Sequence, residues 1–197
     1  MYNPCMAIES FYLRKKIKYH LTTLRSYLKL EDIPETHDDS VDEYYSKVEI
    51  KIIEICLLTR KLEDLGKLPD DALKNVKLNV KKYESKGPEE QRAYVDFEKE
   101  YALDDCKDET VSLRDVCNMV THSYILQATG NEMHAFSDLL VTSDFTQFKG
   151  LYLISIVDLV KACKDVVDLY PNYMTATYDI KKHKWIHSRV IKGQEDN

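Results

Sequence analysis

Two long segments near the N-terminus repeat apolar residues with the period of an α-helix, and they constrain the fold more than any other feature. A helix of 3.6 residues per turn gathers such positions on one face. The first segment, residues 7–30, carries Leu13, Ile17, Leu21, Leu24 and Leu28. The second, residues 40–66, carries Val41, Tyr45, Val48, Ile52, Ile55 and Leu62. The sequence therefore predicts two long helices joined by a polar loop at residues 31–39.

The second helix has recognisable ends. Ser40 with Glu43 matches a capping box at its start, and Gly66 followed by Pro69 predicts its stop. Additional apolar positions widen its buried face and indicate burial on more than one side: Ile50, Ile53 and Leu57.

The rest of the chain mixes weaker helical and strand signals. We expect a strand at 76–80, a turn at 86–88, and a short helix or ordered loop in the acidic run up to Glu109. A helix should follow at 113–126, capped by Thr110 or Ser112. Strands are predicted at 139–142 and 151–154, then a helix at 157–170 that begins at a Ser155–Asp158 capping box, and a hairpin at 174–178 and 184–191.

Together these segments predict an α+β, mainly α fold: a helical bundle with a small C-terminal antiparallel sheet and hairpin. We expect a single domain over 1–197, with a bundle core at 1–128 and an α/β extension at 129–197 that packs on it. The sheet should pack on the helix at 157–170. The residues expected to be almost fully buried in one core are Ile52, Ile55, Leu113, Val116 and Val120.

Composition excludes several classes of protein. No window approaches 18 uncharged apolar residues, so no membrane span is expected, and residues 11–20 are too charged for a secretory signal. The five cysteines include no CxxC pair, and Cys56, Cys117 and Cys163 fall in apolar helical stripes. We therefore expect a cytoplasmic protein with neither a disulfide framework nor a zinc site.

A row of polar side chains marks the segment at 113–124. Arg114, Asn118 and His122 are four residues apart, so on a helix they share one flank, away from the apolar stripe. A cation, an amide and an imidazole in line can hold a phosphate and move a proton. The same row can equally be a solvated helix face.

Basic residues concentrate in two stretches although the net charge is −6. We name as nucleic-acid-binding candidates Lys15, Lys16, Lys18, Arg25, Lys181, Lys182, Lys184 and Arg189. Such a patch can face phosphates despite an acidic total. The alternative is that two solvated elements merely carry basic residues.

Other motifs fail. The chain lacks GxxxxGK[ST], GxGxxG, GxSxG and HExxH. His183 and His187 have a metal-like spacing, but four residues on a strand span about 13 Å, too far for one ion. The acidic stretch 104–108 lacks the glycine of a calcium loop. No cofactor or metal is expected.

The segment at 117–124 resembles the signature helix of the HEPN superfamily, whose members carry an arginine, four to six intervening residues, a histidine and often a tyrosine two places later. His122 and Tyr124 match the histidine and tyrosine, and Asn118 matches the polar residue that often follows the arginine. The arginine position at that spacing holds Cys117. Either Arg114, one turn earlier, substitutes for it, or the site has lost its arginine.

The resemblance implies a metal-independent endoribonuclease of a toxin–antitoxin or phage-defence system, acting as a homodimer. Arg114, Asn118 and His122 would then be catalytic. Tyr124 would be a candidate for regulatory nucleotide addition or, alternatively, a core residue. The second hypothesis is a catalytically degenerate scaffold that binds a partner protein, such as an antitoxin, or nucleic acid. No sequence feature decides whether the chain is an enzyme.

Overall fold

The computed structural model describes residues 4–28, 38–87, 96–130, 136–171 and 173–190. The helices are α1 (Pro4–Leu28), α2 (Asp38–Asp64), α3 (Ala72–Asn75), α4 (Phe97–Glu100), α5 (Leu113–Thr121) and α6 (Ile156–Val167). The strands are β1 (Lys77–Ser85), β2 (Tyr101–Ser112), β3 (Ser123–Gly130), β4 (Phe136–Ser143), β5 (Leu151–Ser155), β6 (Tyr173–Asp179) and β7 (Lys184–Val190).

A five-stranded antiparallel sheet is the centre of the fold, in the order β2-β1-β5-β4-β3. The predicted helical bundle with a small C-terminal sheet is therefore wrong. Three of the five strands, β1, β2 and β3, come from the part of the chain assigned to the bundle core, where only one strand was expected, at 76–80. That strand is confirmed as the first half of β1. The strands predicted at 139–142 and 151–154 exist, but they join this larger sheet. The predicted hairpin is confirmed as a separate two-stranded sheet, β6-β7.

In the acidic run before Glu109, the expected short helix is present as α4, but from Tyr101 on the chain forms strand β2. It is an edge strand, and its residues from Leu103 to Asp108 are exposed. Charged side chains protect an exposed edge from pairing with other chains, and they leave no apolar alternation for a sequence to show. Cross-strand ion pairs such as Lys107–Glu84, 3.4 Å, join β2 to β1.

Helix α5 ends at Thr121, five residues before its predicted end at 126. Its N-cap is Ser112, whose hydroxyl accepts a hydrogen bond from the Asp115 amide. At the other end, the Thr121 hydroxyl donates to the carbonyl of Cys117. Residues after His122 pair with β4 instead of continuing the helix. Tyrosine, isoleucine and threonine suit a strand, so pairing with β4 overrides the helical pattern.

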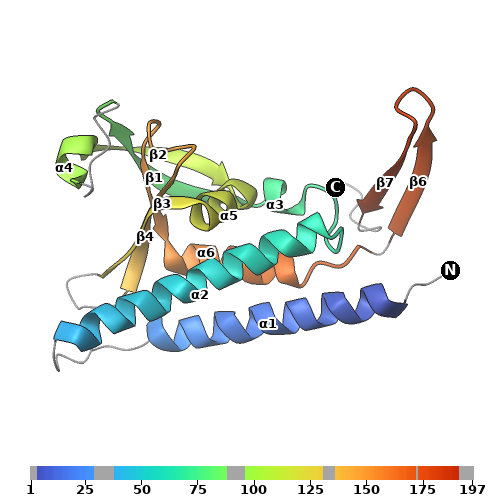
Figure 1. Ribbon diagram of the computed structural model, residues 1–197, viewed down its shortest axis with the longest axis horizontal. Coiled ribbons are helices and arrows are strands. Elements are labelled where there is room, and N and C mark those ends of the chain that lie inside the picture. Colours follow the sequence, from blue (N-terminus) through green and yellow to red (C-terminus); the bar gives the residue numbers. More distant parts are fainter. Residues whose placement is uncertain (1–3, 29–37, 88–95, 131–135, 172, 191–197) are drawn as a thin grey trace, which may run out of the picture.

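Helices cover one face of the sheet. α2, α5 and α6 lie next to it, and α1 runs antiparallel to α2 on the far side (Figure 1). The five residues predicted to share one core are each at most 2% exposed and belong to one cluster, so this prediction is confirmed. A smaller cluster on the opposite face of the sheet contains Tyr101, Ile125 and Leu151.

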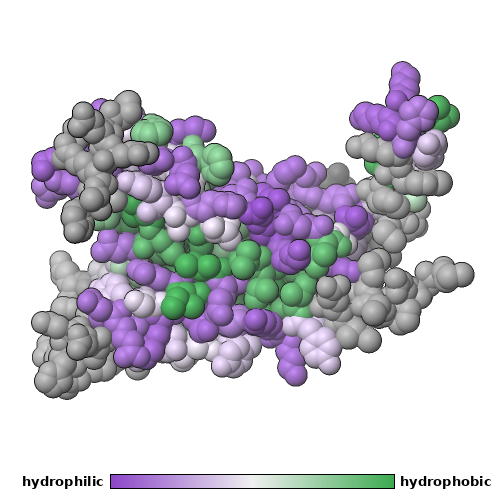
Figure 2. Space-filling model, viewed as in Figure 1, coloured by the Kyte–Doolittle hydropathy of each residue, from purple (hydrophilic) through white to green (hydrophobic). Residues whose placement is uncertain are grey.

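Helix α2 does not bury all of its apolar residues. Ile50 and Leu57 are each 52% exposed, so the predicted burial on a second side is wrong at these positions. Figure 2 shows a hydrophobic band that crosses the molecule over α2, between hydrophilic regions above and below.

The ends of α2 and α6 follow local sequence rules closely. Gly66 has a φ of 65° and its amide donates to Glu63, while the Lys67 amide donates to Leu62. This pair of bonds is a Schellman motif, as the glycine predicted. At the start of α2, Ser40 lies within the first turn and not before it. Ser155 caps α6 as predicted, but α6 ends at Val167 and not at Tyr170.

Candidate functional site

The polar row predicted at 113–124 lies where α5 crosses the C-terminal half of α2. One turn of α2 presents Arg60, Glu63 and Asp64 to this crossing, because residues three and four apart share a helix face. On the other side are Arg114 and His122, the first turn and the C-cap of α5. Ion pairs and hydrogen bonds join the two helices along this line, which we call the α2–α5 seam.

Arg60 is the residue that sequence reasoning missed. Its Nη1 atom lies 3.1 Å from Nε2 of His122 and 3.2 Å from the Thr121 hydroxyl. An arginine side chain is always charged and only donates. Nε2 of His122 must therefore accept, which places the proton of the neutral ring on Nδ1. Spacing along α5 could not reveal Arg60, because it comes from a helix about sixty residues earlier.

His122 is exposed, and its ring meets Phe145 edge to face with centroids 6.2 Å apart. Phe145 is itself 78% exposed. The imidazole is thus open to solvent on one side and is held by Arg60 on the other.

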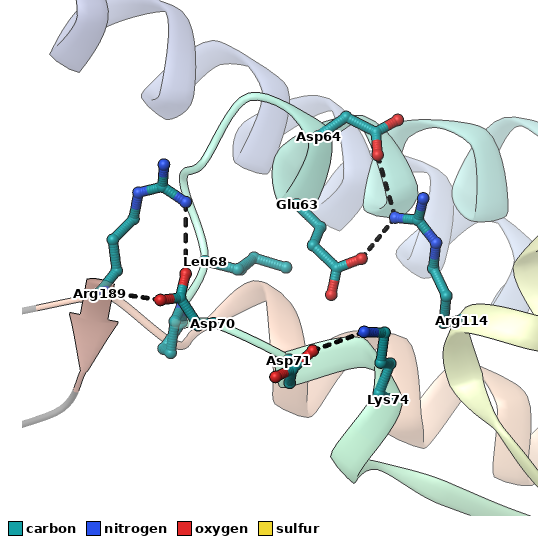
Figure 3. Close-up of a pocket in the computed structure, with 9 residues that line it drawn as sticks. Glu63, Asp64, Leu68, Asp70, Asp71, Lys74, Arg114 and Arg189 are labelled. Carbon is teal, nitrogen blue, oxygen red and sulfur yellow. Dashed lines mark hydrogen bonds and ion pairs between the residues drawn. The ribbon is translucent and has the colours of Figure 1, made fainter. Parts of the chain in front are cut away.

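Arg114 is committed to carboxylates. Its Nη1 atom pairs with Asp64, 3.0 Å, and with Glu63 (Figure 3). Partial burial by itself lowers the pKa of Arg114, but the hydrogen bonds and charges of Asp64 and Glu63 outweigh it and raise the pKa overall. Any anion that reaches Arg114 must compete with both carboxylates.

The remaining residues of the motif fall in different environments. Asn118 is partly buried, and its backbone carbonyl accepts the His122 amide. Cys117, at the family's arginine spacing, is 0% exposed and lies in the core. Tyr124 is on β3 and 40% exposed, so the alternative that it packs in the core is wrong.

A cavity of about 480 Å³ adjoins the Arg114 end of the seam. Besides Arg114, Glu63 and Asp64, it is lined by Leu68, Pro69, Asp70, Asp71, Lys74 and Arg189. Figure 3 shows that each lining cation has a carboxylate partner: Lys74 pairs with Asp71 at 2.8 Å and Arg189 with Asp70 at 3.4 Å. With four acids and three bases, the cavity is poorly suited to phosphate.

The predicted nucleic-acid-binding residues separate into two groups. Those on α1 are exposed: Lys15, Lys16, Lys18 and Arg25, with Lys18 paired to Asp168 at 2.5 Å. Those of the hairpin differ. Lys181 and Lys182 are exposed at its turn, which points away from α1 (Figure 1), and Arg189 is tied to Asp70. The side chain of Lys184 lies outside the described residues.

Among the described residues, no cluster of histidine, cysteine and carboxylate side chains has the geometry of a metal site, and no helix is long and apolar enough to cross a membrane. Comparison of the chain with protein-family models, curated proteins and solved structures found no match. The resemblance to the HEPN superfamily therefore stays a prediction, carried by Asn118, His122 and Tyr124.

Proposed function

We propose that this protein is a metal-independent endoribonuclease, with His122 as the general base and Arg60 as the cation that binds the phosphate. The observation that carries the proposal is the contact between Nη1 of Arg60 and Nε2 of His122 on an exposed surface. This pair supplies from α2 the arginine that the α5 motif lacks at position 117. It is consistent with a distant relationship to the HEPN superfamily.

The chemistry follows from the pair. A phosphodiester that binds Arg60 must compete with Asp64, which lies 3.7 Å from Nε of Arg60. It draws the guanidinium away from Nε2 of His122, so that the lone pair of Nε2 becomes free. Nε2 then takes the proton of the 2′-hydroxyl, and the 2′-oxygen attacks phosphorus while the bond to the 5′-oxygen breaks. The departing 5′-oxygen takes a proton from water, and His122 later returns the proton it accepted to solvent. The products carry a 2′,3′-cyclic phosphate and a 5′-hydroxyl. Arg60 offsets the negative charge that develops on the phosphoryl oxygens.

The other motif residues have supporting roles in the proposal. Arg114 positions the seam by holding α5 against Glu63 and Asp64, and it reaches substrate only if those pairs open. Asn118 orients an oxygen of the substrate, and the exposed Tyr124 is the candidate for nucleotide addition. The proposal places the protein in the cytoplasm, where free thiols persist. It also includes a homodimer and an antitoxin or other partner, as the resemblance implies.

The test is cleavage of a single-stranded RNA by purified protein in the presence of a chelator. Wild type should cut it and leave 2′,3′-cyclic phosphate ends, whereas an oligonucleotide of the same sequence without 2′-hydroxyls should stay intact. His122→Ala and Arg60→Gln should each lower the rate by about 100-fold or more, as expected on loss of a general base or an oxyanion donor. His183→Ala, at an exposed histidine of the hairpin turn, is the matched control and should cleave normally.

A second candidate function is a scaffold that binds a protein partner. Exposed apolar side chains favour it: Ile50 and Leu57 on α2, of which Leu57 lies one turn before Arg60, and Phe145 next to His122. The commitment of Arg114 to two carboxylates favours it as well. If wild type cleaves no RNA, and His122→Ala leaves the free energy of unfolding unchanged, the scaffold explains the structure better.

A further inference from the structure

The outer face of α1 combines aromatic and basic side chains without a single acid. From Ser10 to Leu28 the helix contains no aspartate or glutamate. A step of about 100° per residue divides this stretch into two sides. Leucine and isoleucine turn inward, whereas the exposed side carries Phe11, Tyr12, Lys15, Lys16, Lys18, Tyr19, Thr22, Arg25 and Ser26.

The aromatic residues of this face are unusually open. Phe11 is 60% exposed, Tyr12 62% and Tyr19 65%. Phe11 and Tyr12 meet edge to face with centroids 5.7 Å apart. Three large rings on one solvent-facing side contribute little to the core. They do offer flat apolar surface to a ligand.

Positive charge is interleaved with these rings. Lys15 and Lys16 lie between Tyr12 and Tyr19, and Arg25 lies about 15 Å further along the helix than Lys15. Lys18, at the flank of the face that adjoins α6, pairs with Asp168. The face therefore presents a strip about 21 Å long from Phe11 to Arg25, in which cations lie between aromatic rings and beyond Tyr19.

We propose that this face binds single-stranded nucleic acid, with bases stacked on Tyr12, Tyr19 and Phe11 and phosphates paired with Lys15, Lys16 and Arg25. Unpaired bases expose flat faces that stack on aromatic side chains, and the backbone beside them is anionic. A duplex keeps its bases stacked on one another, so the rings would have no partner in it.

An anionic membrane is a poorer fit to the same face. A helix that lies in a membrane interface buries leucine, phenylalanine or tryptophan along one side. Here the aliphatic residues of the helix, such as Ile17 and Leu24, pack inward at 0–1% exposure. Thr22 and Ser26 occupy the outer face next to Tyr19, and they would gain nothing in the acyl region.

This face is distinct from the α2–α5 seam. Helix α2 lies between α1 and α5 (Figure 1), and the strip consists of the solvent-exposed residues of α1, with Lys16 at the flank nearest Glu54 of α2. The inference goes beyond the proposed cleavage, because stacking and phosphate pairing need no 2′-hydroxyl. A deoxy oligomer therefore tests this face even if the protein cuts no RNA.

The experiment is fluorescence anisotropy of a labelled twelve-residue oligothymidylate with the full chain. Tyr12→Ala with Tyr19→Ala should weaken binding at least about 10-fold, because each stacked base contributes about 1–3 kcal/mol. Lys15→Gln with Lys16→Gln should also weaken it and flatten the salt dependence. With three phosphate pairs, the logarithm of affinity should fall with the logarithm of salt concentration with a slope of about −2.

Two control variants isolate the face. Phe148→Ala removes an exposed aromatic far from α1 in sequence, and Lys161→Gln removes an exposed lysine on α6. Both should bind like wild type, and a duplex of the same length should bind more weakly than the single strand. His122→Ala should bind normally, which separates this face from the seam.

Three results would overturn the inference. The first is that the wild-type chain does not bind the oligomer at low salt. The second is that the α1 variants bind it as well as wild type does. The third is that vesicles of phosphatidylserine and phosphatidylcholine bind the chain in an α1-dependent way while the oligomer does not, which would assign the face to a membrane.

Discussion

Replacing Arg14 should destabilise the fold although this residue lies in the middle of a basic stretch. Its side chain is 2% exposed, unlike its neighbour Lys15. The guanidinium donates to the carbonyl of Val167, the last residue of α6, and at 2.6 Å to the carbonyl of Lys67 in the loop after α2. It also lies 3.9 Å from the centre of the Tyr170 ring. One side chain thus ties α1 to the ends of two other helices.

The expected loss follows from these contacts. Hydrogen bonds from a charged donor contribute about 1.5–3 kcal/mol each, so two give about 3–6 kcal/mol. Burial opposes this, because it disfavours the charged form and lowers the pKa of Arg14. The net cost of Arg14→Met, which keeps most of the volume but leaves both carbonyls unpaired, should be about 3 kcal/mol. For a domain of ordinary stability, about 5–15 kcal/mol, that is a large share.

Urea denaturation followed by circular dichroism measures this loss. Lys15→Met is the matched control, because it also replaces a cation with methionine but at the neighbouring, exposed position. It should change the free energy of unfolding by less than about 0.5 kcal/mol. If Arg14→Met costs less than about 1 kcal/mol, or no more than the control, Arg14 does not tie the three helices together.

Three further predictions concern other parts of the structure. Burial lowers the pKa of His20. The charges of two nearby lysines act in the same direction, whereas Glu54 opposes the shift. At low pH the unfolded chain therefore binds a proton at this histidine more readily than the folded chain does. Stability should therefore fall as the pH drops below about 6.5, and denaturation of His20→Gln as a function of pH should show less of this fall. In a Cys5→Ser background, a maleimide should label exposed Cys106 quickly and buried Cys117 only after unfolding; fast labelling of both would contradict the packing. Gly66→Ala should cost about 1–2 kcal/mol in a urea titration, because its φ of 65° strains any side chain; an unchanged midpoint would argue against the α2 terminus described above.

The features that the sequence predicted well are those specified by a pattern of residues close together in the chain. The apolar residues of α1 and α2 recur with the period of one helix face. The capping residues Ser112, Ser155 and Gly66 each make hydrogen bonds to residues close to them in the sequence. These signals lie within a few residues of the structure they specify. These predictions were right because no distant segment competes for the same backbone groups.

The sheet could not be predicted in the same way, because its strands depend on partners far along the chain. β2 is charged along its exposed middle and is specified by pairing with β1, not by alternation. The segment after His122 has a helical pattern that pairing with β4 overrides. The assignment of residues 1–128 to a helical bundle core was wrong for this reason: apart from the strand expected at 76–80, it missed the strands of this region.

The candidate site likewise combines features that are local in sequence with contacts that depend on tertiary packing. The row Arg114, Asn118 and His122 is readable from spacing on one helix, and the structure places its first and last members at the α2–α5 seam. Arg60 reaches His122 only because α2 packs against α5, and the carboxylates of Glu63 and Asp64 hold Arg114 for the same reason. These contacts arise from tertiary packing, which a motif within one helix does not encode.

Cleavage of RNA by Arg60 and His122 can be measured in a comparison of three proteins. Wild type, His122→Ala and His183→Ala are each incubated with single-stranded RNA and a chelator, and the ends of the products are analysed. We expect fragments with 2′,3′-cyclic phosphate ends from wild type and His183→Ala, and about 100-fold less product from His122→Ala at unchanged stability. Equal cleavage by all three proteins, or none by any of them, would contradict the proposed mechanism.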